Sequence, residues 1–212
     1  MRLYLSSFRI GGFPERLKEM AGEGGEAIVL ANACDAYADA RDEAVERELT
    51  ALGELGFRSR ELDLRDYFGR DDVGRALAGA NLVWVRGGSA FVLRKALESS
   101  GTDRMLVDAL ASDSFVYGGY SAGVCVLGED ISIFDTVDDR VDVERAYGEL
   151  AREDGLGVID FIVVPHVDSP GHPETEQCTA LSRNLQQNGI EHFALRDDDV
   201  VVVDGDQTTL LR

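Results

Sequence analysis

The chain has 212 residues, of which 44% are hydrophobic, so it can bury the core of one globular domain, and we expect a single domain spanning residues 1–212. Its 40 acidic and 21 basic residues leave a net charge of −19, which argues against nucleic acid and anionic membranes as partners, because both would be repelled. The sequence has no run of about 18 apolar residues and no leader-like apolar segment, so we expect a cytoplasmic protein.

The three cysteines are Cys34, Cys125 and Cys178, an odd number without the spacing of metal ligands. Thiols stay reduced in the cytosol, so we expect buried, unpaired cysteines and no disulfide. Cys125 lies one helical turn beyond Ser121, and we interpret it as a small apolar packing residue and not as a nucleophile.

Apolar runs typical of strands alternate with helical patterns along most of the chain. Strands are expected at 2–7, 26–31, 57–64, 82–85, 115–117 and 161–165, then at 192–195, 200–203 and 208–211. Helices are expected at 14–20, 40–55, 71–78, 91–97, 104–111 and 173–187, with a further helix and loop over 141–156. This order indicates an α/β fold in three layers, with a doubly wound, mainly parallel sheet and helices on both faces. Ligands of such sheets bind beyond the carboxyl ends of the strands.

The most informative stretch is Gly119-Tyr120-Ser121-Ala122-Gly123, which follows an expected strand and precedes an apolar helical segment. It matches G-x-S-x-G, the nucleophile elbow, in which a sharp strand-to-helix turn presents the serine hydroxyl at a helix N-terminus. The same five residues also fit a tight strand–helix turn with an ordinary capping serine. A nucleophile additionally requires a base and an oxyanion hole.

His166 is the best placed of the three histidines to act as that base. It follows the expected strand 161–165, at the same edge of the sheet as Ser121, whereas His172 lies in a polar loop and His192 begins a short strand. The N–H group of Ala122, directly after the nucleophile, and that of Gly88, after the strand at 82–85, can form the oxyanion hole.

Three segments then resemble, in order and spacing, the peptidase E family of serine peptidases. They are Val85–Leu93 (VRGGSAFVL), Tyr117–Gly123 (YGGYSAG) and Val164–His166 (VPH), and the likeness extends from the first strand to the helix after His166. The resemblance implies a class I glutamine amidotransferase-like, flavodoxin-like fold with serine in place of cysteine. It implies hydrolysis of small peptides, best known as dipeptides with N-terminal aspartate, without metal or cofactor. By this resemblance Ser121 is the nucleophile, His166 the base, and Gly88 with Ala122 the oxyanion hole.

The chain departs from the family pattern at two places. The acidic third member of the family's triad lies about fifteen residues beyond the serine, where this chain offers Asp135, Asp138 and Asp139; we rank Asp138 first. The aspartyl dipeptidases carry an arginine for the substrate's aspartate in a Glu-Thr-Arg-Glu run, and Glu176 stands at the place of that arginine. We therefore expect Glu176 to face the substrate and to disfavour an N-terminal aspartate.

Other functions stay open at this point. A metal hydrolase could use His166, Asp168 and His172, although no third strong ligand cluster accompanies them. A cyanophycinase-like hydrolase of aspartate–arginine polymers and a non-catalytic binding module are the alternatives on the same fold. The expected partner is a short peptide, no cofactor or metal is expected, and formation of a homodimer is left open.

Overall fold

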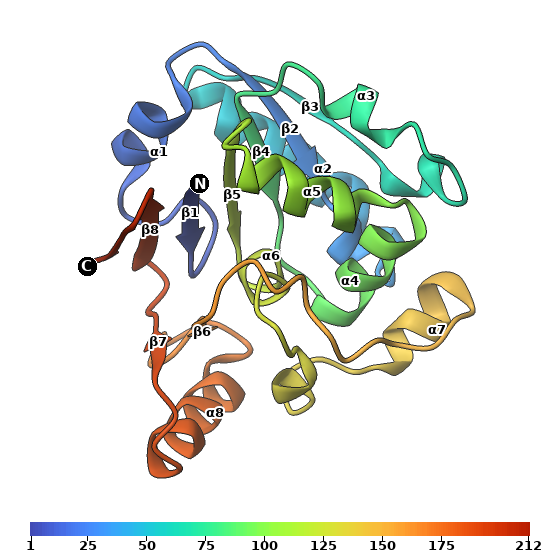
Figure 1. Ribbon diagram of the computed structural model, residues 1–212. Helices are drawn as coiled ribbons and strands as arrows, with labels where there is room; N and C mark the ends of the chain where they lie inside the picture. Colours follow the sequence, from blue (N-terminus) through green and yellow to red (C-terminus); the bar gives the residue numbers. More distant parts are fainter.

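The computed structural model describes every residue from Met1 to Arg212. At its centre is a seven-stranded sheet in the order β3-β2-β4-β5-β1-β8-β9 (Figure 1). The strands are β1 (Arg2–Ser6), β2 (Glu26–Leu30), β3 (Arg58–Glu61), β4 (Leu82–Val85), β5 (Val116–Tyr120), β6 (Ile162–Val164), β7 (His192–Ala194), β8 (Val200–Asp204) and β9 (Gln207–Leu211). The α-helices are α1 (Pro14–Ala21), α2 (Ala38–Glu54), α3 (Val73–Leu77), α4 (Ala90–Ser99), α5 (Thr102–Ala111), α6 (Ala122–Cys125), α7 (Val141–Tyr147) and α8 (Thr175–Gln187).

The sheet is parallel from β3 to β1 and antiparallel at its other edge. β1 pairs with β5 in parallel register, so that Ser6, the last residue of β1, stands opposite Tyr120, the last residue of β5. On the other side β1 pairs antiparallel with β8, which forms a hairpin with β9. The predicted α/β fold with a mainly parallel sheet is confirmed.

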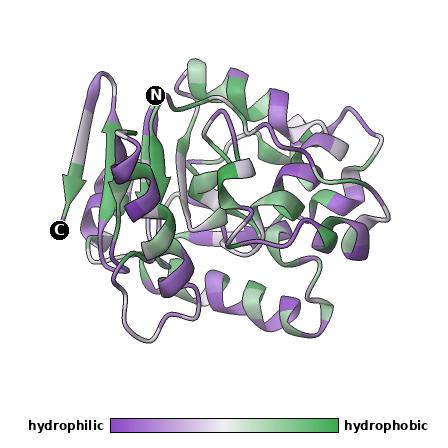
Figure 2. Ribbon diagram, turned by 90° about the horizontal axis from the view of Figure 1, so that it is seen from below, coloured by the Kyte–Doolittle hydropathy of each residue, from purple (hydrophilic) through white to green (hydrophobic).

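Alternate residues of each strand pack against different helices, which produces the three layers. One face, with residues such as Leu5, Val83 and Val85, packs against α3, α4, α5 and α6. The other face, with residues such as Val29 and Trp84, packs against α1 and α2. In Figure 2 green, hydrophobic residues are frequent in the strands, and purple and green residues alternate along the helices. Both faces of the parallel strands are thus buried, as expected for a doubly wound sheet.

The segments that carry the candidate site gather beyond the carboxyl ends of the parallel strands. In Figure 1, β1 points toward the side of the molecule where α6, α7 and α8 lie. There β6 and β7 form a separate two-stranded parallel sheet, with Val164 opposite Ala194, so the expected strand at 161–165 does not join the central sheet. The expected strand at 57–64 is shorter and ends in a 3₁₀ turn from Leu64 to Tyr67. No helix has the length and apolar content needed to cross a bilayer.

Candidate active site

Ser121 lies in the sharp turn between β5 and α6, where the G-x-S-x-G pattern predicts it. Its φ of 51° and ψ of −121° fall in a region that residues other than glycine rarely adopt, which is the strain expected of a nucleophile elbow. Close packing against β4 explains the flanking glycines, because a Cβ on Gly119 would lie 2.7 Å from the carbonyl oxygen of Val85, and one on Gly123 would overlap the same atom. The turn therefore holds the serine hydroxyl at the start of α6 at a cost in backbone strain.

The backbone around Gly88 can supply an oxyanion hole next to this serine. Gly88 has a φ of 147°, and a Cβ there would lie 2.5 Å from the carbonyl oxygen of Ala33, so only glycine fits. Its N–H group makes no hydrogen bond within the protein. Ala122 is the first residue of α6, so its N–H group has no partner in the preceding turn. Gly87 packs next to Ser121, since a Cβ on Gly87 would lie 2.8 Å from the Cβ of Ser121.

The buried carboxylate of Glu48 contacts residues next to both proposed oxyanion-hole donors, Gly88 and Ala122. Glu48 on α2 is 2% exposed and accepts hydrogen bonds from the indole N–H of Trp84 at 2.8 Å and from the hydroxyl of Tyr120 at 2.7 Å. It also pairs with the guanidinium of Arg86 at 3.3 Å, and Arg86 donates to the carbonyl oxygen of Gly87 at 2.7 Å. Glu48 thereby connects the residue that precedes Ser121 to the loop that carries Gly88.

His166 reaches the same edge of the sheet through the end of β1. Its backbone N–H donates to the hydroxyl of Ser7 at 2.8 Å, and Ser7 directly follows Ser6, which stands opposite Tyr120. His166 has a φ of 58° and is 1% exposed. The ring of Phe8 packs edge-on against both Tyr120 and His166, with centroid distances of 6.0 and 5.8 Å. His166 therefore lies at the edge of the sheet where β5 ends at Tyr120, the residue before Ser121. The side chains of His166 and Ser121 are not hydrogen-bonded to each other here, which is common before substrate binds.

The carboxylate that holds His166 is Asp197, not one of the aspartates between 135 and 139. Nδ1 of His166 lies 2.8 Å from an oxygen of Asp197, so Nδ1–H donates and Nε2 keeps a free lone pair. Burial lowers the pKa of His166 to about 4, and the hydrogen bond to Asp197 acts in the opposite direction. The imidazole is therefore neutral near pH 7 and can accept a proton.

The expected third member, Asp138, makes a different contact. Its carboxylate accepts the N–H group of Ala90 at 2.8 Å, at the first residue of α4, while Asp135 pairs with Arg140 and Asp139 accepts the N–H group of Val141. The acidic loop is thus satisfied by its own neighbours and by the start of α4, and none of its carboxylates contacts His166. Burial raises the pKa of Asp138 to about 7. Asp138 instead holds the helix that begins just after Gly88.

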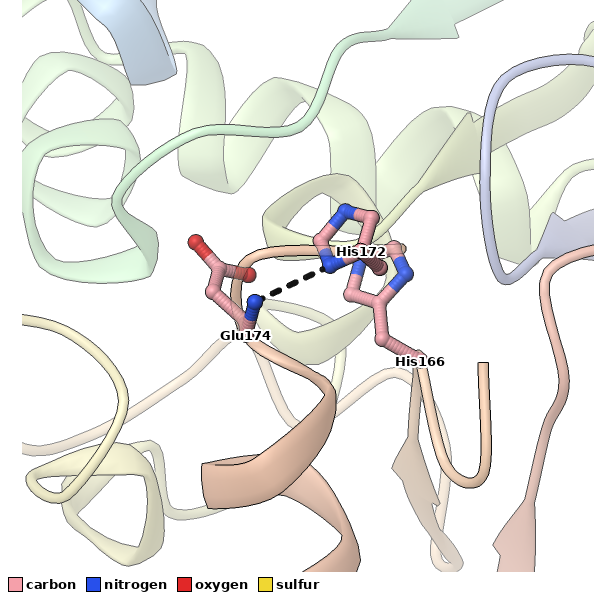
Figure 3. A group of neighbouring side chains, drawn as sticks. All are labelled: His166, His172 and Glu174. Atoms are coloured by element: carbon pink, nitrogen blue, oxygen red, sulfur yellow. Dashed lines mark hydrogen bonds between the residues drawn. The ribbon is translucent and has the colours of Figure 1, made fainter. Parts of the chain in front are cut away.

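His172, which the sequence places in a polar loop, lies directly on His166. The two imidazole rings are stacked with a centroid distance of 3.5 Å and an interplanar angle of 6° (Figure 3). Phe8 packs edge-on against His172, with a centroid distance of 5.2 Å. Nδ1 of His172 accepts the backbone N–H of Glu174 at 3.2 Å. One ligand atom from each of His166, His172 and Glu174 lies within 4.8 Å of the others.

Glu174 and Glu176 take different places on the segment that starts α8. Glu176 is exposed, whereas Glu174 is half-buried beside the histidines. The structure therefore brings Glu174 to the site, two residues before the position expected from the family pattern. Burial raises the pKa of Glu174, and its carboxylate has no cationic partner. A cavity of about 680 Å³ lies elsewhere, between α8, β7 and the C-terminus.

Comparison with known proteins shows the family and the fold of the chain. An uncharacterized peptidase of Listeria innocua is 27% identical over 162 residues, which are 74% of this chain and 75% of that protein. A crystal structure from Listeria monocytogenes, provisionally assigned as a peptidase E, superimposes with a TM-score of 0.77 at 20% identity, covering 100% of this chain and 98% of that one. A peptidase from an acI-B1 actinobacterium gives a TM-score of 0.66 at 16% identity, covering 99% and 86%. Residues 15–211 match the model of peptidase family S51, and the chain therefore belongs to that family.

Proposed function

We propose that the protein is a serine peptidase in which Ser121 is the nucleophile, His166 the general base and Asp197 the residue that orients it. One observation carries the proposal: the strained elbow serine directly follows Tyr120, and Phe8 packs against both Tyr120 and a buried, neutral histidine whose Nδ1–H is held by a carboxylate. The neutral imidazole presents Nε2 as the acceptor that a serine nucleophile needs. An ordinary capping serine would not account for the strain at Ser121 or for the buried His166–Asp197 pair.

Each proton has a place in the reaction. Nε2 of His166 takes the proton of Ser121 as its oxygen attacks the scissile carbonyl, and Asp197 stabilises the imidazolium that forms. The N–H groups of Gly88 and Ala122 donate to the oxyanion of the tetrahedral intermediate. His166 then protonates the leaving amine, which departs and leaves an acyl group on Ser121. Water hydrolyses this ester by the same steps, with His166 again as base.

Charged side chains near the reacting groups favour short peptides with free termini. Glu174 and Asp138 are half-buried carboxylates, the charge of Glu174 contributes to the raised pKa of Asp138, and neither has a cationic partner. An α-ammonium group or a basic side chain would compensate their charge. Arg9 has its guanidinium 4.9 Å from the centre of the Phe8 ring and no carboxylate partner, so it can receive the α-carboxylate of a dipeptide.

The same charges favour neutral or basic N-terminal residues over aspartate. Glu174 beside the site, and Glu176 on the same first turn of α8, both oppose a substrate carboxylate at that end. A cyanophycinase-like activity is the second candidate, because aspartate–arginine polymers present cationic side chains to these carboxylates. Cytoplasmic location stays a prediction from the sequence.

The test is a dipeptide-library assay with the wild-type protein and Ser121→Ala. We expect hydrolysis by the wild type, none above background by the variant, inactivation by a serine-directed reagent and full activity with a chelator. Loss of activity on chelation, with Ser121→Ala still active, would instead support a metal hydrolase. If the protein hydrolysed no dipeptide of the library but cleaved an aspartate–arginine polymer, the result would favour the second candidate.

A further inference from the structure

The side chains of His166, His172 and Glu174 form a cluster that serine catalysis leaves unexplained. Figure 3 shows the two rings stacked and the Glu174 carboxylate on the side of the rings where its own N–H meets Nδ1 of His172. Serine hydrolysis requires one histidine, and Asp197 already orients it. A second imidazole stacked at 3.5 Å and a half-buried carboxylate within 4.8 Å add a set of donor atoms of the kind that binds transition metals.

The hydrogen bonds of both imidazoles leave a nitrogen that a metal can bind. Nδ1 of His172 accepts the backbone N–H of Glu174, and Nδ1–H of His166 is held by Asp197, so each ring has a nitrogen with a lone pair that a metal can use. Asp197 accepts Nδ1–H of His166, which is the outer contact that metal-binding histidines typically make, and it directs Nε2 away from the carboxylate. The cluster therefore has an ordered first ligand.

Glu174 supplies the charge that a cation would neutralise. Its carboxylate accepts no hydrogen bond and forms no ion pair, although it is half-buried. Asp138 adds negative charge nearby and has only the N–H of Ala90 as a partner. Phe8 packs edge-on against both imidazoles. A divalent ion at this place would meet two neutral nitrogens, one carboxylate oxygen and an apolar wall.

We propose that His166, His172 and Glu174 form a binding site for Zn²⁺ or a similar transition-metal ion, and that occupation of this site inhibits the peptidase. Ligands of a tetrahedral zinc ion lie about 3.3 Å apart, so side-chain rotations have to draw the three donor atoms together and open the ring stack at one edge. Coordination at Nδ1 of His172 would replace the 3.2 Å hydrogen bond from Glu174 N–H, which is long for such a bond.

Zinc inhibits because it binds the lone pair of Nε2 of His166, which the proposed mechanism needs. When Nε2 of His166 binds zinc, it can no longer accept the proton of Ser121, so the first step of hydrolysis stops. Zinc also occupies the carboxylate of Glu174, which the proposed function assigns to the substrate's amino terminus. The two therefore compete, and inhibition should be competitive with peptide. The effect on activity rests on the proposed function, whereas the binding of the metal does not.

The binding experiment uses full-length Ser121→Ala, so that its result is independent of catalysis. Co²⁺ and Zn²⁺ are titrated into this protein by calorimetry, and the visible absorption of bound Co²⁺ is recorded. We expect one ion per chain and a visible Co²⁺ absorption band typical of nitrogen and oxygen ligands. We expect no thiolate-to-cobalt band from Cys34, Cys125 or Cys178. Adding His172→Phe, which keeps an aromatic ring on His166, or Glu174→Gln should each weaken binding by at least about tenfold. His192→Phe is the matched control, because His192 bonds to Ser182 and Ile190 outside the cluster, and it should leave the affinity unchanged.

The activity experiment measures peptide hydrolysis by the wild type at increasing free Zn²⁺, with Mg²⁺ as a control. We expect inhibition by zinc but not by magnesium, reversal by a chelator, and an inhibition constant at least about tenfold higher in His172→Phe when each protein is compared with its own uninhibited rate. The proposal would be overturned if Ser121→Ala bound no zinc, or if His172→Phe did not weaken binding. A rise in hydrolysis on adding zinc would also overturn it. If Ser121→Ala binds zinc as described but the wild type hydrolyses no peptide, the proposed function fails and the metal site stands.

Discussion

Replacement of Asp197 by asparagine tests which carboxylate orients His166, a role for which the sequence alone favours Asp138. The asparagine side chain has nearly the same shape, but its amide can present N–H to Nδ1 of His166, and the imidazole would then carry its proton on Nε2. That tautomer cannot accept the proton of Ser121. The Asp197→Asn variant also loses the negative charge that stabilises the imidazolium, 2.8 Å from Nδ1 in the structure.

The magnitude follows from these two effects. Exchange of the corresponding aspartate in a chymotrypsin-type triad lowers kcat about 10⁴-fold, mainly through the wrong tautomer. Asp197 is 31% exposed, so water screens part of its charge, and we expect the lower end, about 10³-fold, which corresponds to about 4 kcal/mol of activation free energy. KM should change little, because Asp197 contacts His166 and Ser169 and none of the groups proposed to bind the peptide.

The assay is steady-state hydrolysis of a neutral dipeptide, with Asp138→Asn as the matched control. An asparagine at position 138 can still accept the N–H of Ala90 through its amide oxygen, and the pKa of Asp138, about 7, leaves this carboxyl close to half protonated at neutral pH. We therefore expect Asp138→Asn to keep kcat within about tenfold of the wild type. The reverse result, with Asp138→Asn losing about 10³-fold and Asp197→Asn nearly unchanged, would refute the assignment of Asp197 and restore the one made from sequence.

Three further outcomes are expected. Ser121→Ala and His166→Ala should each lower kcat/KM by several orders of magnitude and the double variant little more, because the pair acts as a unit; additive losses would argue that they act separately. The acid limb of kcat/KM should lie below about pH 5, because burial lowers the pKa of His166 to about 4 and the base stays neutral above that value; a limb at the ordinary histidine pKa would contradict the burial argument. Glu174→Gln should raise the kcat/KM ratio of Asp-Leu to Ala-Leu more than Glu176→Arg does, because only Glu174 lies beside the histidines; a larger effect at Glu176 would show that α8 turns its exposed face to the substrate.

Sequence predicts those parts of the fold and site that depend on local pattern. The elbow is a local structure, so the glycines around Ser121 and the preceding apolar strand are sufficient to predict the turn. Gly88 is predicted for the same reason, since a strand followed by two glycines and an N-capping serine, Ser89, marks the loop. His166 follows from its place after an apolar strand. In all three cases the sequence signal lies within a few residues in the chain, although the contacts that hold Gly88 and His166 reach Ala33 and Ser7.

Asp197 depends on a pairing that the sequence does not display. Asp197 lies 31 residues beyond His166 and belongs to a run of three aspartates, a composition typical of a hairpin turn. What brings it to His166 is the parallel pairing of β6 with β7, each only three residues long, in a register that places Val164 opposite Ala194. Both strands then end on the same side, and the residues just after them meet. A three-residue strand gives too weak a periodic signal for its partner to be predicted.

Burial keeps His166, the proposed base, neutral in surroundings whose negative charge favours the protonated ring. Asp197 contacts His166, and Glu174 lies within 4.8 Å of it, on a protein with a net charge of −19. Negative charge favours the imidazolium, so an exposed histidine here would have a raised pKa and would be protonated near neutral pH. The stacked ring of His172 and the edge of Phe8 exclude water from His166, and this desolvation outweighs the carboxylates. The rings of His172 and Phe8 are therefore as necessary to the proposed chemistry as the triad itself. They allow Glu174 to bind the amino terminus of the substrate without protonation of His166.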